Sequence, residues 1–199
     1  MRFRNRQQAG EELAAALGEY RGAPAVVYAL PRGGVVLGRI VAGALEAPLD
    51  LLIPRKIGAP GNEEYAIASV TETGNVVKSR EVELIDEVWF EKAVEAQRGE
   101  AKRRRERYLA GRTPPDVAGK TAIIVDDGIA TGLTMKAAIV ELRARQPSKI
   151  VVAVPVAPRD TVEELERLAD RVVVLDKPRL FMGSIGAYYE SFDQVSDEE

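Results

Sequence analysis

The sequence predicts an α/β protein with an open, mostly parallel sheet flanked by helices on both faces. Short apolar runs alternate with amphipathic helical segments, most regularly in the C-terminal half. Strands that are apolar throughout are typical of parallel sheets whose two faces are both covered by helices. The 199 residues are 46% hydrophobic and 30% charged, which suits one globular domain. We therefore expect a single domain over residues 1–199.

The N-terminal part of the chain contains two predicted helices and two predicted strands. Residues 6–20 place their apolar side chains on one helical face. The apolar run 24–30 predicts a strand, which a glycine turn joins to a helix over residues 35–46. Residues 48–53 predict a second buried strand.

The middle of the chain is less regular. Residues 54–64 contain two Pro and two Gly and predict a loop. The runs 65–70 and 75–78 flank a polar turn and predict a β-hairpin. Residues 80–110 are mostly helical in pattern, and we assign residues 80–112 to a helical insertion.

The C-terminal half predicts a buried strand at residues 121–125 and two further strands at residues 149–156 and 171–176. Two helical segments, 133–146 and 160–170, separate them. This strict alternation is the strongest indication of a parallel sheet.

The composition excludes many kinds of chemistry, because the chain has 0 Cys and 0 His. Disulfides, zinc fingers, thiol nucleophiles and every mechanism that needs an imidazole are ruled out. Catalysis must use carboxylates, Lys, Arg, hydroxyls or backbone dipoles, and a metal must be a hard cation such as Mg²⁺. The net charge of −3 gives no general nucleic-acid signal. No signal peptide and no apolar run of ~18 residues is seen, so we expect a cytoplasmic protein without a membrane partner.

A basic run occupies residues 98–107, where six of ten residues are Lys or Arg. Such a run is most often one charged face of a helix. It also leaves open a contact with RNA or DNA, although a lone basic run is weak evidence for one.

The loop after the predicted strand 121–125 carries the chemistry. Asp126 and Asp127 end the strand, and a spacer of small residues leads into a helix. Ligands of parallel sheets bind beyond the carboxyl ends of the strands. Residues 130–134 would offer backbone N–H groups, two hydroxyls and a helix N-terminus to a phosphate. The two carboxylates come too early for that phosphate, and suit sugar hydroxyls or a water-bridged Mg²⁺. The plainer alternative is a surface turn with Thr131 as a helix cap.

The whole pattern of four apolar residues, two acids, a small spacer and Thr-Gly-x-Thr is more specific than a turn. It closely resembles the donor-binding motif of the type I phosphoribosyltransferases, and the resemblance extends over about residues 24–192. It implies a fold of that family with a small C-terminal hood or tail, here residues 177–199. The resemblance makes Asp126 and Asp127 catalytic, with an indirect contact to Mg²⁺. It assigns the 5′-phosphate loop to Gly128, Ala130, Thr131, Gly132, Leu133 and Thr134.

The resemblance also assigns the turn after the first core strand. In this family that turn binds pyrophosphate through backbone amides and often contains a non-proline cis peptide bond. Pro31, Arg32, Gly33 and Gly34 match it, with the bond between Pro31 and Arg32 as the candidate. An ordinary strand-to-helix turn is the alternative.

Two further regions match less specific parts of the family. Residues 54–69 resemble the mobile loop that closes over the reacting sugar, with Arg55 and Lys56 reaching the leaving pyrophosphate; a solvated basic loop is the alternative. Phe181 matches an aromatic residue that stacks on the acceptor base, and a role in the core is the alternative. Tyr188 and Tyr189 are interpreted as structural.

One position departs from the purine-salvage members, which carry an acid just before Thr-Gly-x-Thr. Ala130 occupies that position, so salvage of hypoxanthine or guanine is not supported. The resemblance implies an Mg²⁺-dependent enzyme that transfers phosphoribose from 5-phosphoribosyl 1-diphosphate to a nitrogen acceptor, a nucleobase or similar heterocycle. The main alternative is a regulator that binds the same donor together with RNA or DNA, and a weaker one is another pentose-phosphate enzyme. The family also implies a homodimer.

Overall fold

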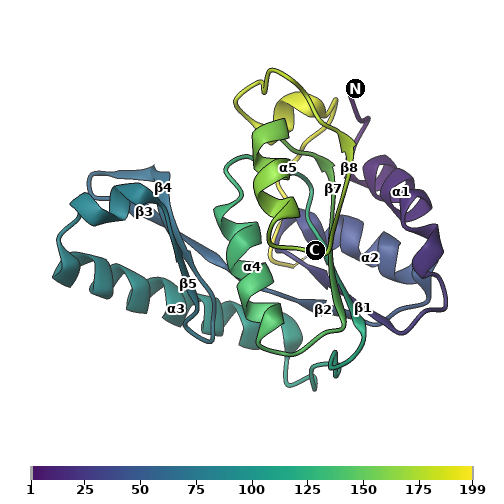
Figure 1. Cartoon of the computed structure of the whole chain (residues 1–199), viewed down its shortest axis with the longest axis horizontal. Coiled ribbons are helices and arrows are strands. Elements are labelled where there is room, and N and C mark those ends of the chain that lie inside the picture. Colours follow the sequence, from purple (N-terminus) through teal and green to yellow (C-terminus); the bar gives the residue numbers. More distant parts are fainter. Residues whose placement is uncertain (1, 199) are drawn as a thin grey trace.

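Five parallel strands form the central sheet, in the order β2-β1-β6-β7-β8 (Figure 1). The structure is a computed structural model that describes residues 2–198. The strands are β1 (Ala25–Ala29), β2 (Leu49–Leu51), β6 (Thr121–Val125), β7 (Lys149–Val156) and β8 (Arg171–Asp176). Every neighbouring pair is parallel, which confirms the predicted sheet.

Helices cover both faces of this sheet, as predicted. On one face lie α1 (Arg6–Ala16) and α2 (Gly33–Leu45), and on the other lie α4 (Leu133–Arg143) and α5 (Arg159–Glu166) (Figure 1). Alternate residues of each strand supply the two cores: in β6, Ile123 packs with α1 and α2, and Ile124 packs with α4. This alternation follows from the period of two in a β-strand.

An antiparallel unit extends away from the central sheet, at the left of Figure 1. We call residues 55–109 the arm. It contains the three-stranded sheet β3 (Arg55–Ala59), β4 (Asn62–Val70) and β5 (Val76–Lys78), followed by the 3₁₀ helix η2 (Arg80–Leu84) and helix α3 (Glu87–Leu109). The predicted hairpin of residues 65–70 and 75–78 is confirmed.

The prediction of a loop over residues 54–64 was wrong, because Arg55–Ala59 is a strand paired with β4. Pro60 and Gly61 instead form a tight turn between β3 and β4, where Gly61 has a φ of 77°. A bulge near Gly58 interrupts the register of this hairpin, so the sequence of β3 lacks a clear alternation.

The N-terminal residues of the described chain contact the segment that follows β8. Phe3 forms a β-bridge with Tyr189, and the Glu190 N–H donates to the Phe3 carbonyl at 2.8 Å. The 3₁₀ helix η3 (Ile185–Tyr188) lies just before this contact, and η1 (Gly18–Tyr20) replaces the end of the helix predicted over residues 6–20. Within residues 2–198, no helix is both long and apolar enough to cross a membrane.

Candidate active site

A cavity of about 800 Å³ opens at the carboxyl ends of β1 and β6. Its lining comes from the turn after β1, the loop after β6, the arm and the C-terminal segment. Open parallel sheets bind their ligands at this edge. Of the residues predicted for the site, all but Gly34, Leu133 and Phe181 line this cavity.

Asp126 and Asp127 lie side by side at the end of β6 and both line the cavity. The Asp127 N–H donates to Asp126 Oδ1 at 2.8 Å, which fixes one carboxylate against the backbone of the other. Arg6 Nε donates to Asp127 Oδ2 at 2.7 Å, and the Tyr189 hydroxyl donates to the Asp127 carbonyl at 2.6 Å. Arg6 and Tyr189 therefore hold the side chain and the backbone of Asp127 from outside the loop.

Burial raises the pKa of Asp126 well above its usual range, and repulsion from the Asp127 carboxylate adds to this effect. Burial also raises the pKa of Asp127, but the hydrogen bond and charge of Arg6 oppose the change. The pKa of both carboxyl groups is thus raised, and Arg6 limits the rise at Asp127. In their ionised form the two carboxylates can accept hydrogen bonds from hydroxyl groups.

The loop from Gly128 to Thr134 leads into α4 with an open helix N-terminus. Gly132 is the N-cap residue, with a φ of 78°, and no side chain caps the helix there. The first N–H groups of α4 thus lack a side-chain acceptor, which makes them available to an anion. The Thr161 hydroxyl donates to the Ala130 carbonyl at 2.9 Å and fixes the loop from behind. Leu133 is buried, so it offers only its backbone to the cavity side.

The turn after β1 contains the cis peptide bond between Pro31 and Arg32 that the resemblance implied. Pro31, Arg32 and Gly33 line the cavity. Gly34 lies behind the turn, where a Cβ atom would come within 2.9 Å of Asp126 Oδ1. Its absence of a side chain allows the turn to pack against the acid pair.

The arm brings Arg55 and Lys56 into the cavity wall. Arg55 Nε donates to Gln97 Oε1 of α3 at 3.2 Å, so the β-hairpin and α3 are tied together there. Burial lowers the pKa of Arg55, and the neighbouring Arg104 adds to the shift. Two cationic side chains thus line the same cavity as the turn after β1 and residues 126–132, which we call the acid loop.

Phe181 lies outside the cavity, and its ring stacks on Tyr188 with centroids 5.5 Å apart. Phe181 is partly buried against the core, which agrees with the alternative role that the sequence left open for it. The aromatic side chains among the described cavity residues are Trp89 of α3 and Phe192 of the C-terminal segment. Tyr188 and Tyr189 are buried, as their structural interpretation predicted.

Sequence reasoning missed Arg6, Thr161, Tyr189 and Phe192 as neighbours of the acid loop. Arg6 lies 121 residues before its partner Asp127, and Tyr189 lies 62 residues after it. No local spacing marks such contacts, because they arise only when the chain ends pack against the sheet.

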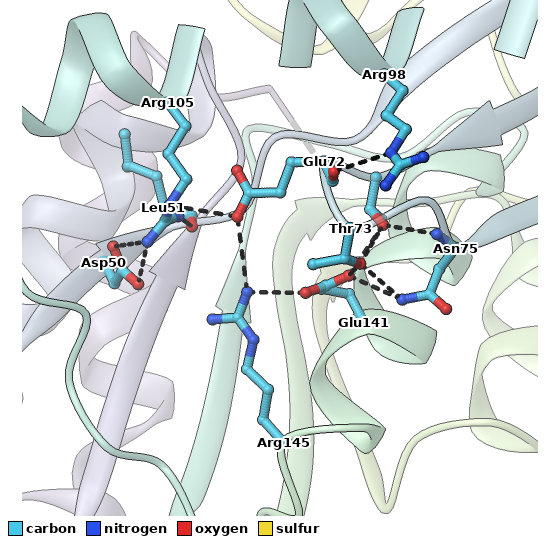
Figure 2. Close-up of polar contacts among 10 residues, drawn as sticks. Asp50, Leu51, Glu72, Thr73, Asn75, Arg98, Arg105, Glu141 and Arg145 are labelled. Atoms are coloured by element: carbon cyan, nitrogen blue, oxygen red, sulfur yellow. Dashed lines mark hydrogen bonds and ion pairs between the residues drawn. The ribbon is translucent and has the colours of Figure 1, made fainter. Parts of the chain in front are cut away.

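A polar network joins the arm to the central sheet (Figure 2). Arg105 of α3 pairs with Asp50 of β2 at 3.2 Å and with Glu72 of the β4–β5 turn at 3.3 Å. Arg145 pairs with Glu141 of α4 at 2.9 Å and reaches Glu72 at 3.9 Å.

The same network engages the rest of the β4–β5 turn and the start of the basic run. Glu141 Oε2 accepts hydrogen bonds from Thr71, Thr73 and Asn75, and Arg98 donates to the Glu72 carbonyl (Figure 2). Five of the six basic side chains of residues 98–107 make ion pairs or hydrogen bonds within the protein, namely Arg98, Arg103, Arg104, Arg105 and Arg107.

Comparison with known families adds the decisive observation. Residues 3–187 match the model of the phosphoribosyl transferase domain. The chain belongs to the phosphoribosyltransferase family. This membership confirms the resemblance that the acid loop indicated, and the five-stranded sheet has the type I fold of that family.

Relatives of this phosphoribosyltransferase chain include a protein of Mycobacterium tuberculosis that is provisionally named a phosphoribosyl transferase. The two are 42% identical over 200 residues, which cover 99% of this chain and 45% of the relative. The chain thus spans less than half the length of that protein. The solved structure of TT1426 from Thermus thermophilus is 42% identical, covers 100% of this chain and 95% of its own, and has a TM-score of 0.82.

A more distant structure shares the fold alone. The purine phosphoribosyltransferase from Pyrococcus horikoshii is 19% identical, with a TM-score of 0.50 over 85% of this chain and 80% of its own.

Proposed function

We propose that this chain transfers phosphoribose from 5-phosphoribosyl 1-diphosphate to a ring nitrogen of a heterocyclic acceptor, with release of pyrophosphate. One observation carries the proposal. An acid pair and an open helix N-terminus lie on one loop, and they face a cationic turn and two arm cations across one cavity. A phosphorylated sugar with a diphosphate at its other end has charges that suit this arrangement.

Each part of the donor has a matching part of the cavity. The loop from Gly128 to Thr134 would hold the 5′-phosphate, because its N–H groups and hydroxyls bind anions. Asp127 would accept hydrogen bonds from the ribose hydroxyls. The backbone of the turn at Pro31 to Gly33 would bind the pyrophosphate, with Arg32, Arg55 and Lys56 supplying positive charge.

The bond from C1′ to the pyrophosphate would break before the new bond to nitrogen is complete, which leaves positive charge on the ribose. The acid pair lies on the loop that holds the sugar and would stabilise that charge. Binding of the remote 5′-phosphate would fix the reacting carbon, since non-reacting groups can supply binding energy for positioning.

Mg²⁺ fits the site as a companion of the donor. Among the described residues, no group of three or more Asp and Glu side chains is arranged to hold a metal. Asp126 and Asp127 offer hard oxygen ligands and would contact the ion through water, while donor oxygens would supply its other ligands. When bound, the ion would supply charge neutralisation of the leaving pyrophosphate.

The experiment measures pyrophosphate release from the donor with Mg²⁺ and a panel of purines, pyrimidines and other nitrogen acceptors. We expect release with at least one acceptor. The double variant D126N/D127N should lower turnover at least about 100-fold, because an electrostatic stabiliser of the transition state is lost. Unchanged turnover in the double variant would contradict the assignment of the acid pair.

The donor-binding regulator remains the second candidate, favoured by Ala130 in place of the acid of purine-salvage enzymes. Its nucleic-acid contact is less well supported, since five of the six basic side chains of residues 98–107 are engaged internally. Tight donor binding without release, together with salt-dependent RNA or DNA binding, would favour this candidate over the enzyme.

A further inference from the structure

We propose that Arg6 is a positioning residue for the donor sugar: its guanidinium holds the Asp127 carboxylate in the orientation that meets the ribose hydroxyls. The inference rests on the proposed function and adds the N-terminal helix to it. Arg6 would act through Asp127 and would not contact the reacting atoms.

Three partners fix the Arg6 guanidinium at the cavity wall. Arg6 Nε donates to Asp127 Oδ2 at 2.7 Å, and Arg6 Nη1 donates to the Asp193 carbonyl at 2.6 Å. The central carbon of the guanidinium lies 3.8 Å from the centre of the Phe192 ring. The side chains of Arg6 and Asp127 are only 13% and 15% exposed. A planar cation held by a carboxylate, a carbonyl and an aromatic face has one preferred orientation.

The backbone around Arg6 is fixed as well. Arg6 is the first residue of α1, and the Asn5 side chain caps that helix by accepting from the Gln8 N–H at 2.9 Å. The Ser191 N–H donates to the Arg4 carbonyl at 2.9 Å, so the C-terminal segment lies beside this start. That segment also supplies Tyr189, whose hydroxyl holds the Asp127 carbonyl. The two chain ends therefore hold both the side chain and the backbone of Asp127.

The ion pair lies against the turn assigned to pyrophosphate. A Cβ atom at Gly33 would collide with the Asp127 carboxylate and would come within 2.9 Å of Arg6 Nε. Arg6 uses Oδ2 of Asp127, which leaves Oδ1 to other donors. The ion pair thus lies where the acid loop meets the turn assigned to pyrophosphate. This place suits a role in orienting a ligand better than a role in linking two surface segments.

The test combines R6Q, R6K, D127N and the double variant R6Q/D127N, with R4Q as the control. Arg4 is exposed two residues away, so R4Q removes the same charge without touching the cavity. Donor affinity is measured by calorimetry with Mg²⁺, and KM and kcat are measured from pyrophosphate release. Thermal unfolding of each variant reports on folding.

We expect R6Q to weaken donor binding about 10-fold, or about 1.4 kcal/mol, which is the scale of a hydrogen bond to a charged group. KM for the donor should rise more than kcat falls, because the contact with the sugar exists before the reaction. R6K should recover part of the affinity, and R4Q should match the wild type. In the D127N variant, the added R6Q substitution should lower donor affinity by less than about 2-fold, because the two residues act as one unit.

Four results would overturn the inference, each in a different way. If R6Q binds the donor as tightly as the wild type does, the role proposed for Arg6 is wrong and the proposed function is unaffected. An equal loss from R6Q with and without D127N would show that Arg6 acts on the ligand itself. A wild type that does not bind the donor would overturn the proposed function and this inference together. If R6Q does not fold, R6K decides, and wild-type affinity in R6K would count against the proposal.

Discussion

Asp126 is partly buried in the cavity wall beside a second carboxylate, and its raised pKa implies a cost in folding stability. Burial and Asp127 raise the pKa of Asp126, so the folded chain binds a proton more tightly than the unfolded chain does. Stability from this group is therefore present at low pH and is lost as the pH rises from about 4, the usual Asp value, through the raised pKa. Proteins commonly accept such a cost at functional sites.

We expect D126N to raise the free energy of unfolding by about 0.5–2 kcal/mol at pH 8, as stabilising substitutions at strained functional sites do. The Asn Oδ1 can still accept the Asp127 N–H, so the loop keeps its bond. Urea unfolding of both proteins at pH 5 and pH 8 checks this. The gain should shrink at the lower pH, and a gain independent of pH would rule out the titration of Asp126 as its cause.

Gly33 is a second residue whose identity the site requires. G33A would place a Cβ atom against the Asp127 carboxylate, so we expect the acid loop to shift and turnover to fall at least about 10-fold. Gly43, in the same helix, offers a matched control because a Cβ atom there meets nothing within 4 Å. G43A should keep wild-type turnover and stabilise the helix by about 0.5–1 kcal/mol. Equal turnover in both variants would contradict this reading of the turn.

At the scale of elements, charged side chains dock the arm onto the central sheet. Arg105, 17% exposed, pairs with Asp50, whose side chain is only 4% exposed. Burial raises the pKa of Glu72, and Arg105 and Arg145 oppose that rise. The removal of one partner from such a cluster leaves a buried charge without compensation.

We expect R105Q to lower the free energy of unfolding by about 3 kcal/mol for this reason. R103Q is the matched control, because Arg103 is 58% exposed and pairs only with Glu100 of its own helix. It should change stability by less than about 1 kcal/mol, the usual range for surface pairs. Urea unfolding compares the two, and similar losses would show that the network does not dock the arm.

The elements also show why some predictions succeeded. The strands β6 and β7 are buried apolar runs, and the partly exposed β8 also has an apolar centre, so the sequence predicted all three closely. β3 was missed because it carries Arg, Lys and Gly and is stabilised by its pairing with β4. The acid loop was found because its residues are consecutive. Arg6, whose side chain pairs with Asp127 of this loop, was not found because the two residues are 121 positions apart in the sequence.

At the scale of the whole molecule, one helix connects the two regions that would hold the donor. α4 begins at Leu133, directly after the acid loop, and Glu141 near its far end accepts hydrogen bonds from the β4–β5 turn of the arm. A rigid helix between two sites can transmit a shift from one to the other, provided that both sites bias the same movement. The loop proposed for the 5′-phosphate and the β4–β5 turn of the arm thus contact opposite ends of one helix.

We expect the donor with Mg²⁺ to stabilise the whole chain. At about 100 times its dissociation constant, a ligand that binds only the folded state adds about 2.7 kcal/mol to the free energy of unfolding. Thermal unfolding with increasing donor concentration measures this gain. The double variant D126N/D127N should show a smaller gain at the same concentration, and an identical gain would indicate donor binding elsewhere.

The arm also gives the molecule an intrinsic optical reporter. The chain contains 1 Trp, and Trp89 lies in the cavity wall on α3. Indole emission responds to the polarity around the ring, so a ligand that expels water from the cavity should shift the emission toward shorter wavelength. The fluorescence of the unlabelled protein can therefore follow occupancy of the cavity in real time, in the wild type and in every variant described above.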